Sequence, residues 1–202
     1  MSLSLQRGLV LLAAYLVAAI PFGLLLGRLG GVDIRRTGSG NIGATNVLRS
    51  RGILAGLSTL LLDAAKGAAG VALALRVEPH GWLPLAAVLA VVLGHCYPVY
   101  LAFRGGKGVA TAAGAFAVLS PLLLLLSAAV FVVVAAGWRR VSLASLCAAL
   151  SLPLLAWILG RGDLAVAGLP AALIIVWQHR RNLRRLLAGK EERLGRAVRR
   201  EP

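Results

Sequence analysis

The sequence predicts an all-α integral membrane protein with seven transmembrane helices, an extracytoplasmic N-terminus and a cytoplasmic C-terminus. Three observations support this fold class. Hydrophobic residues make up 59% of the 202 residues and charged residues only 14%, whereas charged residues form roughly 25% of a soluble domain. Apolar runs long enough to cross a bilayer recur along the chain. The 22 lysines and arginines lie mostly in the segments that join these runs on one side, as expected for cytoplasmic loops.

Five apolar runs have the length needed to cross a hydrocarbon core of roughly 30 Å. The first run lacks a small-residue cleavage site, so we expect it to be a transmembrane helix and not a removable signal peptide. The five runs cover residues 9–27, 53–75, 82–103, 141–159 and 164–178.

A further apolar stretch, residues 109–137, is broken only by Ser120 and Pro121. As one helix it would be roughly 43 Å long at 1.5 Å per residue, which exceeds the hydrocarbon core. We therefore expect two short helices around 109–137, which brings the number of spans to seven.

The distribution of positive charge supports this count. With seven spans and the N-terminus outside, 18 lysines and arginines face the cytoplasm, 3 face outside, and Lys66 within a helix completes the 22. Six spans with the same N-terminus would place 13 outside and 8 inside, against the positive-inside rule. We expect a multi-pass membrane protein whose basic loops face the cytoplasm.

The chain is expected to form a single membrane-embedded domain over residues 1–202, because no linker or internal repeat divides it. Its tail, about residues 179–202, is strongly basic. Binding to anionic headgroups and simple topological anchoring both account for this charge. Cys96 and Cys147 lie in apolar runs and are expected to be free, buried thiols.

Two glycine-rich polar segments interrupt the apolar runs, and the predicted topology places both on the cytoplasmic side. Residues 38–49 read GSGNIGATNVLR and residues 103–111 read FRGGKGVAT. Glycine-rich turns present successive backbone N–H groups to phosphate oxygens, and the Arg49 guanidinium suits a bidentate phosphate contact. The pattern indicates a phosphorylated substrate that is bound at the membrane surface.

Other phosphate and catalytic motifs fit poorly. Residues 38–43 match G-x-G-x-x-G, but that fingerprint has meaning only between a strand and a helix of a parallel sheet. Residues 105–108 lack the upstream glycine and the following Ser or Thr of an ATPase phosphate loop. No cluster has metal-ligand spacing and no Gly-x-Ser-x-Gly elbow occurs. We expect no cofactor, no metal and no covalent serine mechanism.

Three ionisable residues fall within the predicted spans. Asp63 and Lys66 share one helix face, and such residues in a membrane are costly and often functional. A structural ion pair explains them equally well. For His95, a structural role and a catalytic role are also equally open.

Polar side chains also gather at the cytoplasmic ends of the last two helices. His179 and Asn182 are three residues apart and therefore share a helix face, which favours a role in substrate binding. Ser142 and Ser145 open the preceding helix on the same side. Capping explains Ser142, and either hydroxyl is placed to face the site.

These segments resemble the signature segments of the bacterial acyl-phosphate-dependent glycerol-3-phosphate acyltransferases, the PlsY family. The resemblance runs in order through nearly the whole chain, with Arg104 where lysine is common and Tyr97 where phenylalanine is common. The segments that carry it are residues 38–49, 94–98, 103–111, 140–145, 179–182 and 186–189.

The resemblance implies transfer of a fatty acyl group from acyl phosphate to the 1-hydroxyl of sn-glycerol 3-phosphate. The products would be 1-acyl-sn-glycerol 3-phosphate (lysophosphatidic acid) and phosphate, in the first step of phospholipid biosynthesis. The partners expected are these two substrates and the lipid bilayer, with no nucleic acid.

Roles are assigned on this basis as hypotheses. Residues 38–46 would hold the acyl-phosphate headgroup, and Lys107 would lie between the two phosphates. Either His179 or a substrate phosphate would accept the hydroxyl proton. The expected catalytic residues are His179 and Lys107, and the expected substrate-binding residues are Ser39, Gly40, Asn41, Gly43, Thr45, Asn46, Arg49, Lys66, Gly105, Gly106, Ser145 and Asn182.

Two other functions share some of these features. A transporter or channel for organic phosphates would need polar groups along a path through the bilayer, whereas here they concentrate on the cytoplasmic side. An acyltransferase that uses acyl-CoA as its donor has similar requirements for glycerol 3-phosphate and stays open.

Overall fold

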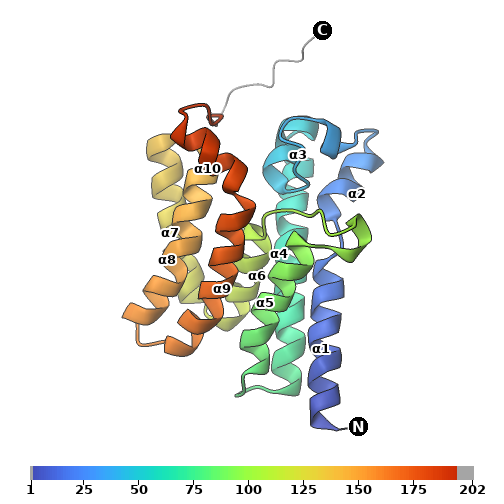
Figure 1. Cartoon of the computed structure of the whole chain (residues 1–202), viewed down its shortest axis with the longest axis vertical. Coiled ribbons are helices and arrows are strands. Elements are labelled where there is room, and N and C mark those ends of the chain that lie inside the picture. Colours follow the sequence, from blue (N-terminus) through green and yellow to red (C-terminus); the bar gives the residue numbers. More distant parts are fainter. Residues whose placement is uncertain (1, 195–202) are drawn as a thin grey trace.

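The computed structural model describes residues 2–194, and this part of the chain folds into helices joined by short turns (Figure 1). The predicted all-α class is confirmed. Residues 195–202 of the predicted basic tail lie outside the described residues. The α-helices are α1 (Leu3–Ala18), α2 (Phe22–Leu29), α3 (Ala44–Arg51), α4 (Ile53–Val77), α5 (Leu83–Cys96), α6 (Val109–Leu119), α7 (Pro121–Trp138), α8 (Val141–Ile158), α9 (Gly162–Gln178) and α10 (Arg180–Leu187), and the 3-10 turns are η1 (Ile34–Arg36) and η2 (Val99–Leu101).

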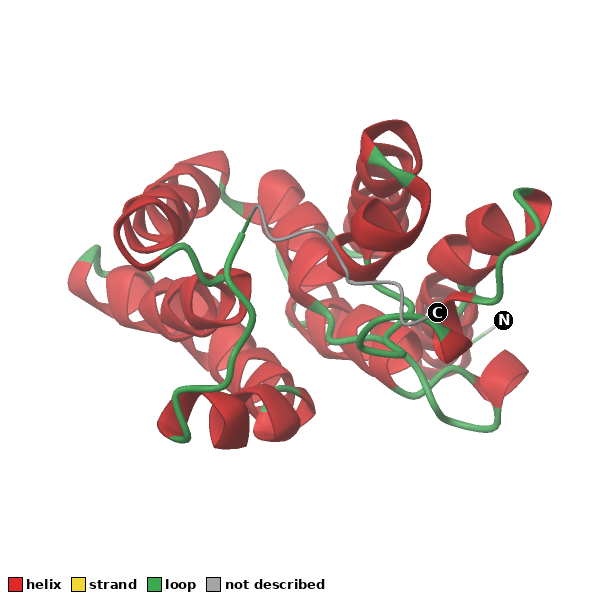
Figure 2. Cartoon of the chain, turned by 90° about the horizontal axis from the view of Figure 1, so that it is seen from above, coloured by secondary structure: helices red, strands yellow, loops and turns green. Residues whose placement is uncertain are grey.

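The helices form two groups that stand side by side (Figures 1 and 2). In the first group, α4 packs against α1, α5 and α6; in the second, α8 packs against α7 and α9. Contacts of α9 with α5 and of α7 with α6 join the groups. The short helices α3 and α10 lie at the same end of the molecule, opposite the N-terminus (Figure 1).

Prolines set three of the helix boundaries. The first apolar run is two helices rather than one, because Pro21 lacks an N–H group and lies at the break between α1 and α2. Pro98 follows the end of α5, which is therefore shorter than the predicted run 82–103. Ser120 caps α7 by accepting a hydrogen bond from Leu123 N at 3.4 Å, with Pro121 at the first helical position.

The expected break within residues 109–137 is confirmed, but the two helices are unequal. α6 has 11 residues and α7 has 18, so only α6 is short. Four helical segments of the described chain are long and apolar enough to cross a membrane: Leu3–Leu29, Leu83–Leu101, Pro121–Trp138 and Val141–Ile158. Counting the pair α9 and α10, which is bent by 62°, as one broken span gives a fifth. The count of seven spans stays a prediction.

Two glycines bring α4 and α6 into backbone contact. A Cβ atom at Gly67 would lie 2.0 Å from the Thr111 carbonyl oxygen, and one at Gly114 would lie 1.8 Å from the Ala64 carbonyl oxygen. Small residues at such positions allow membrane helices to pack closely. This contact holds the short helix α6, and the loop that precedes it, against the middle of α4.

Replacing Gly114 by leucine is therefore expected to destabilise the fold by about 3 kcal/mol, because the new side chain has to push two backbones apart. The midpoint of thermal unfolding in detergent measures this effect. Gly137→Leu is the matched control, since a Cβ atom there meets no atom within 4 Å. Equal midpoints for the two variants would show that the α4–α6 contact is not needed for stability.

Candidate active site

A cavity of about 430 Å³ lies between the two groups of helices. Its polar mouth is formed by the start of α3, the loop before α6 and the residues around α10. Below the mouth the cavity continues between apolar side chains of α4, α6, α7 and α8. These are Leu60, Ala112, Ala113, Leu124, Ala128, Phe131, Val132, Ala148, Ala149 and Leu152.

The first glycine-rich segment is a loop that is held in shape by Asn46. The Asn46 Oδ1 atom accepts a hydrogen bond from Ser39 N at 3.0 Å, and its Nδ2 atom donates to the carbonyl oxygens of Ile34, Thr37 and Asn41 at 2.8, 3.1 and 2.8 Å. Gly38 has a φ of +54°, and a Cβ atom there would lie 2.5 Å from Asn46 Oδ1. Asn46 lines the cavity, but its amide is used within the loop.

The start of α3 faces the cavity mouth. Asn41 Oδ1 accepts a hydrogen bond from Gly43 N at 2.7 Å, which fixes the chain where α3 begins. Ser39, Asn41, Gly43 and Thr45, which belong to the predicted phosphate loop, all line the cavity. The positive end of a helix dipole attracts anions, so this edge of the mouth suits a phosphate group.

The second glycine-rich segment places Lys107 in the cavity. Gly105 N and Gly106 N donate hydrogen bonds to the carbonyl oxygens of Cys96 and His95, at 3.1 and 3.0 Å. The Lys107 ammonium then donates to Asn182 Oδ1 at 2.6 Å. Burial lowers the pKa of Lys107 to about 8, although Glu191 partly offsets this. An anionic ligand beside Lys107 would therefore stabilise its charged form.

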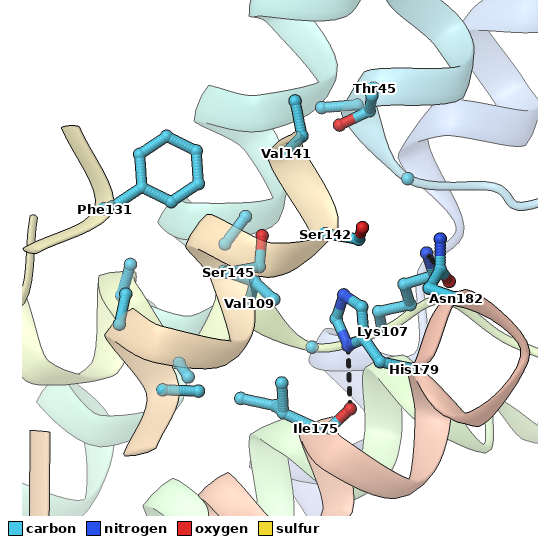
Figure 3. A pocket seen from close by; sticks show the side chains of 18 of the residues that line it. Thr45, Lys107, Val109, Phe131, Val141, Ser142, Ser145, Ile175, His179 and Asn182 are labelled. Carbon is cyan, nitrogen blue, oxygen red and sulfur yellow. Dashed lines mark hydrogen bonds between the residues drawn. The ribbon is translucent and has the colours of Figure 1, made fainter. Parts of the chain in front are cut away.

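His179 stands beside this pair, just after the end of α9 (Figure 3). Its Nδ1 atom lies 2.8 Å from the Ile175 carbonyl oxygen, which only accepts, so Nδ1 carries the proton and Nε2 is free to accept. Burial, together with the Lys107 cation, lowers the pKa of His179 to about 4. The side chain is therefore a neutral hydrogen-bond acceptor at physiological pH.

Two serines of α8 face the same space (Figure 3). Ser142 and Ser145 are both buried and line the cavity. The Ser142 hydroxyl lies near the Glu191 carboxylate, whose pKa it helps to lower, but makes no hydrogen bond of full geometry with the described residues. A buried hydroxyl without a partner is costly, so a ligand that bonds to it would remove this cost.

Two carboxylates from the C-terminal segment close the mouth. Glu191 accepts hydrogen bonds from Asn182 Nδ2 at 2.6 Å and from Arg185 Nε at 2.8 Å. Burial raises the pKa of Glu191, but the Ser142 hydroxyl, Asn182 and Arg185 together hold it below its ordinary value. Glu192 forms an ion pair with Arg49, and Leu194 N donates to the Arg139 carbonyl oxygen at 2.6 Å. Residues 190–194 therefore form a strap from α10 to the turn between α7 and α8.

Four of the predicted site residues do not line the cavity. Gly40 and Gly105 shape the backbone of the two loops, and Gly106 packs against the His95 side chain. Lys66 forms an ion pair with Asp63 at 2.8 Å and donates to the Ile20 carbonyl oxygen at 2.8 Å. Its ammonium therefore points toward the break between α1 and α2, consistent with a structural ion pair.

Other residues that line the cavity were absent from the predicted site. The sequence-based prediction assigns no site role to Asp63, His95 or Ser142 and does not include Ser127. Glu191 and Glu192 line the mouth as well. Two adjacent acids in a strongly basic tail were the one sequence signal that pointed to them.

Known proteins match the chain over most of its length. The family model described as glycerol-3-phosphate acyltransferase matches residues 8–189. A glycerol-3-phosphate acyltransferase from Syntrophotalea carbinolica is 50% identical over 92% of this chain and 96% of its own length. One from Geobacter sulfurreducens is 48% identical over 89% and 93%.

Two crystal structures of PlsY (YgiH), an integral membrane glycerol 3-phosphate acyltransferase, have the same fold. The glycerol 3-phosphate form superimposes with a TM-score of 0.90 at 39% identity, over 94% of this chain and 96% of that chain. The lysophosphatidic acid form gives a TM-score of 0.88 at 38% identity, with the same coverage.

Proposed function

The chain belongs to the glycerol-3-phosphate acyltransferase family, and we propose that it uses acyl phosphate as the acyl donor and forms 1-acyl-sn-glycerol 3-phosphate. The observation that carries this proposal is one cavity with two phosphate-type loops at its mouth and an apolar arm below. The loops suit two phosphorylated substrates, and the arm suits a fatty acyl chain. The crystal structures of the relative include a glycerol 3-phosphate form and a lysophosphatidic acid form.

In the proposed arrangement, the acyl-phosphate headgroup binds at Ser39, Asn41 and the start of α3. Glycerol 3-phosphate binds through Arg49 and Asn182, and Lys107 lies between the two phosphates. Holding both substrates in reacting geometry supplies much of the rate enhancement. Hydroxyl groups such as those of Ser142 and Ser145 would stabilise the developing oxyanion.

The reaction needs no protein nucleophile. The 1-hydroxyl oxygen of glycerol 3-phosphate attacks the carbonyl carbon of acyl phosphate, and the bond from that carbon to the phosphate oxygen breaks. The hydroxyl proton passes to a phosphate group, whose second pKa is about 6. His179, with its lowered pKa, accepts a hydrogen bond from the hydroxyl at Nε2 and orients it.

Replacement of His179 by glutamine tests this division of roles. The glutamine side chain keeps an acceptor but cannot take up a proton, so we expect turnover to stay within about tenfold of the wild type. His179→Leu, which removes the acceptor, should lose more. A general base contributes about 10²–10⁴-fold. A loss of that size in His179→Gln, with the fold intact, would instead assign the proton to His179.

The ion pair between Arg49 and Glu192 leads to a second expectation. A phosphate that reaches Arg49 has to displace Glu192, so Glu192→Gln should lower the KM for glycerol 3-phosphate. Exposed ion pairs are worth up to about 1 kcal/mol, which limits the change to about fivefold. The control is Asp33→Asn, which breaks the ion pair with Arg35 away from the cavity. An unchanged or raised KM in Glu192→Gln would contradict the placement of phosphate at Arg49.

We further propose seven spans in the bacterial inner membrane with the cavity mouth in the cytoplasm, and a single domain over residues 1–202. The position of α3 and α10 at one end, opposite the N-terminus (Figure 1), supports this topology. Cysteine labelling in intact cells and in inverted membrane vesicles tests it. Labelling of Leu187→Cys, on the 82% exposed side chain, is expected only in the inverted vesicles.

One assay separates the candidate functions. Purified protein in lipid vesicles is incubated with labelled glycerol 3-phosphate and either acyl phosphate or acyl-CoA. Labelled lysophosphatidic acid with acyl phosphate alone is the expected result. Product with acyl-CoA alone would reassign the donor. Uptake of label without acylation would favour a transporter over the proposed enzyme.

A further inference from the structure

Lys107 owes its position in the cavity to the end of α5. The loop before α6 turns back on this helix through the hydrogen bonds of Gly105 N with the Cys96 oxygen and of Gly106 N with the His95 oxygen. Lys107 follows directly and reaches Asn182 across the mouth. Whatever fixes the turn at residues 105–106 therefore fixes the ammonium group.

The His95 imidazole is in contact with this turn. A Cβ atom at Gly106 would lie 2.1 Å from His95 Nε2 and 2.9 Å from both Cδ2 and Cε1. The φ of Gly106 is not in the left-handed region, so its backbone does not require glycine. It is the approach of the imidazole that leaves no room for a side chain at residue 106.

The other side of the imidazole faces a buried carboxylate. His95 Nδ1 lies 3.6 Å from Asp63 Oδ1, the oxygen that also pairs with the Lys66 ammonium at 2.8 Å, and His95 Nδ1 has no hydrogen-bond partner among the described residues. The Asp63, Lys66 and His95 side chains are 2–4% exposed. An apolar replacement of such a buried ion pair often costs nothing in stability, so stability alone does not account for these charges.

The position of this cluster argues against direct binding of substrate phosphate. Asp63 and His95 line the cavity, but a carboxylate repels a phosphate. Lys66, which would attract one, is used by Asp63 and by the Ile20 carbonyl oxygen. Within the cluster, Asp63 faces the His95 imidazole, and the imidazole contacts the turn that carries Lys107.

We propose that His95, oriented by Asp63, is a positioning residue. It fixes the position of the Gly105–Lys107 turn relative to α5 and hence the position of the Lys107 ammonium. Asp63 holds the ring with Nδ1 toward α4, and the Nε2 edge then supports the turn at Gly106. Lys66 neutralises Asp63 and ties it to the break between α1 and α2. This inference rests on the proposed function only in that Lys107 binds the phosphate of glycerol 3-phosphate.

A size-compensation experiment tests the contact. Gly106→Ala should weaken glycerol 3-phosphate binding by at least about tenfold, because the new methyl group pushes the turn away from His95. Adding His95→Ala removes the ring atoms that clash, so the double variant should bind more tightly than Gly106→Ala alone. His95→Ala by itself should weaken binding, because the turn loses its support.

Gly105→Ala is the matched control. Its Cβ atom would lie 2.1 Å from the His95 carbonyl oxygen, a backbone atom that His95→Ala does not remove. No recovery is therefore expected when His95→Ala is added to Gly105→Ala. Failure of His95→Ala to relieve Gly106→Ala, or equal relief of both glycine variants, would overturn the proposal.

The role of Asp63 is tested with Lys66 replaced at the same time, so that no buried charge is left alone. Asp63→Asn with Lys66→Met is expected to raise the KM for glycerol 3-phosphate about tenfold and to add little to the effect of His95→Ala when the changes are combined. No rise, or a rise that adds in full to that of His95→Ala, would show that Asp63 does not act through the turn. If this pair of changes prevents folding, the double-mutant cycle of His95→Ala and Gly106→Ala tests the proposal by itself.

A direct binding measurement distinguishes failure of the proposed function from failure of the positioning role of His95. Isothermal titration with sn-glycerol 3-phosphate is carried out on the wild type, on Lys107→Met and on the cycle of variants. A wild type that does not bind, or a Lys107→Met variant that binds normally, contradicts the proposed function. Normal wild-type binding through Lys107 without coupling between residues 95 and 106 contradicts only the positioning role.

Discussion

Replacing Lys107 by methionine is expected to lower kcat/KM for acyl transfer by about 10³-fold. Removing one partner of a buried charge pair costs about 3–5 kcal/mol, and each 1.4 kcal/mol is about a factor of ten. The ammonium is partly buried at the mouth, donates to Asn182 at 2.6 Å, and is the cation placed between the two proposed phosphates. Initial rates with acyl phosphate and glycerol 3-phosphate measure the loss. The exposed Arg104, in the same loop, supplies the control variant Arg104→Met, which should retain most activity.

The same lysine predicts how affinity changes with pH. Its pKa of about 8 in the unoccupied site means that the ammonium is charged below pH 8 and loses its proton as the pH rises through that value. Phosphate with a second pKa of about 6 is already a dianion there. The KM for glycerol 3-phosphate should therefore rise above pH 8 in the wild type. Lys107→Arg, which keeps its charge, should lack this rise. A wild-type KM that is constant between about pH 7 and 9.5 would contradict the assignment.

Filling the apolar arm is expected to change which donors the enzyme accepts. Ala149 of α8 lines the arm, and phenylalanine there would displace the far part of a long acyl chain. Each methylene that is no longer buried costs about 0.8 kcal/mol. Three or four of them would lower activity with a long-chain acyl phosphate by about 100-fold, while a short-chain donor should react nearly as before.

The control for this change lies on the next residue of the same helix. Leu150 is 48% exposed and does not line the cavity, so Leu150→Phe should leave the donor preference unaltered. Comparison of kcat/KM for short-chain and long-chain acyl phosphates gives the result. A parallel loss with both donors in Ala149→Phe would mean that the arm does not hold the acyl chain.

Much of this architecture was predictable because its signals are local. Apolar length located the helices, and Ser120 with Pro121 predicted the break between α6 and α7. Pro21 and Pro98 carried the same kind of signal, but the apolar residues around them suggested longer helices. The ends of the helices were therefore less well predicted than their positions along the sequence.

The two glycine-rich loops were also predictable, but the division of labour within them was not. Asn46 and Ser39 look alike in the sequence as hydrogen-bonding groups. Only the fold shows that the Asn46 amide is used by three backbone carbonyls of its own loop. Whether a polar side chain faces the cavity or supports a loop depends on contacts that composition does not record.

Long-range pairing explains the remaining differences. Glu192 meets Arg49 although 142 residues separate them along the chain, and His95 meets Asp63 from a different helix. Such pairs leave no periodic pattern. The acids in the tail were overlooked because the surrounding charge is strongly basic, which suggested contact with lipid rather than with the site.

The strap at residues 190–194 has a consequence for how salt affects the enzyme. Since Glu192 already neutralises Arg49, the arrival of a phosphate at that guanidinium is an ion exchange, in which one anion replaces another. Dissolved salt weakens both the pair of Arg49 with Glu192 that is lost and the pair of Arg49 with phosphate that forms. Affinity for glycerol 3-phosphate should therefore vary less with ionic strength than the many positive charges around the mouth suggest.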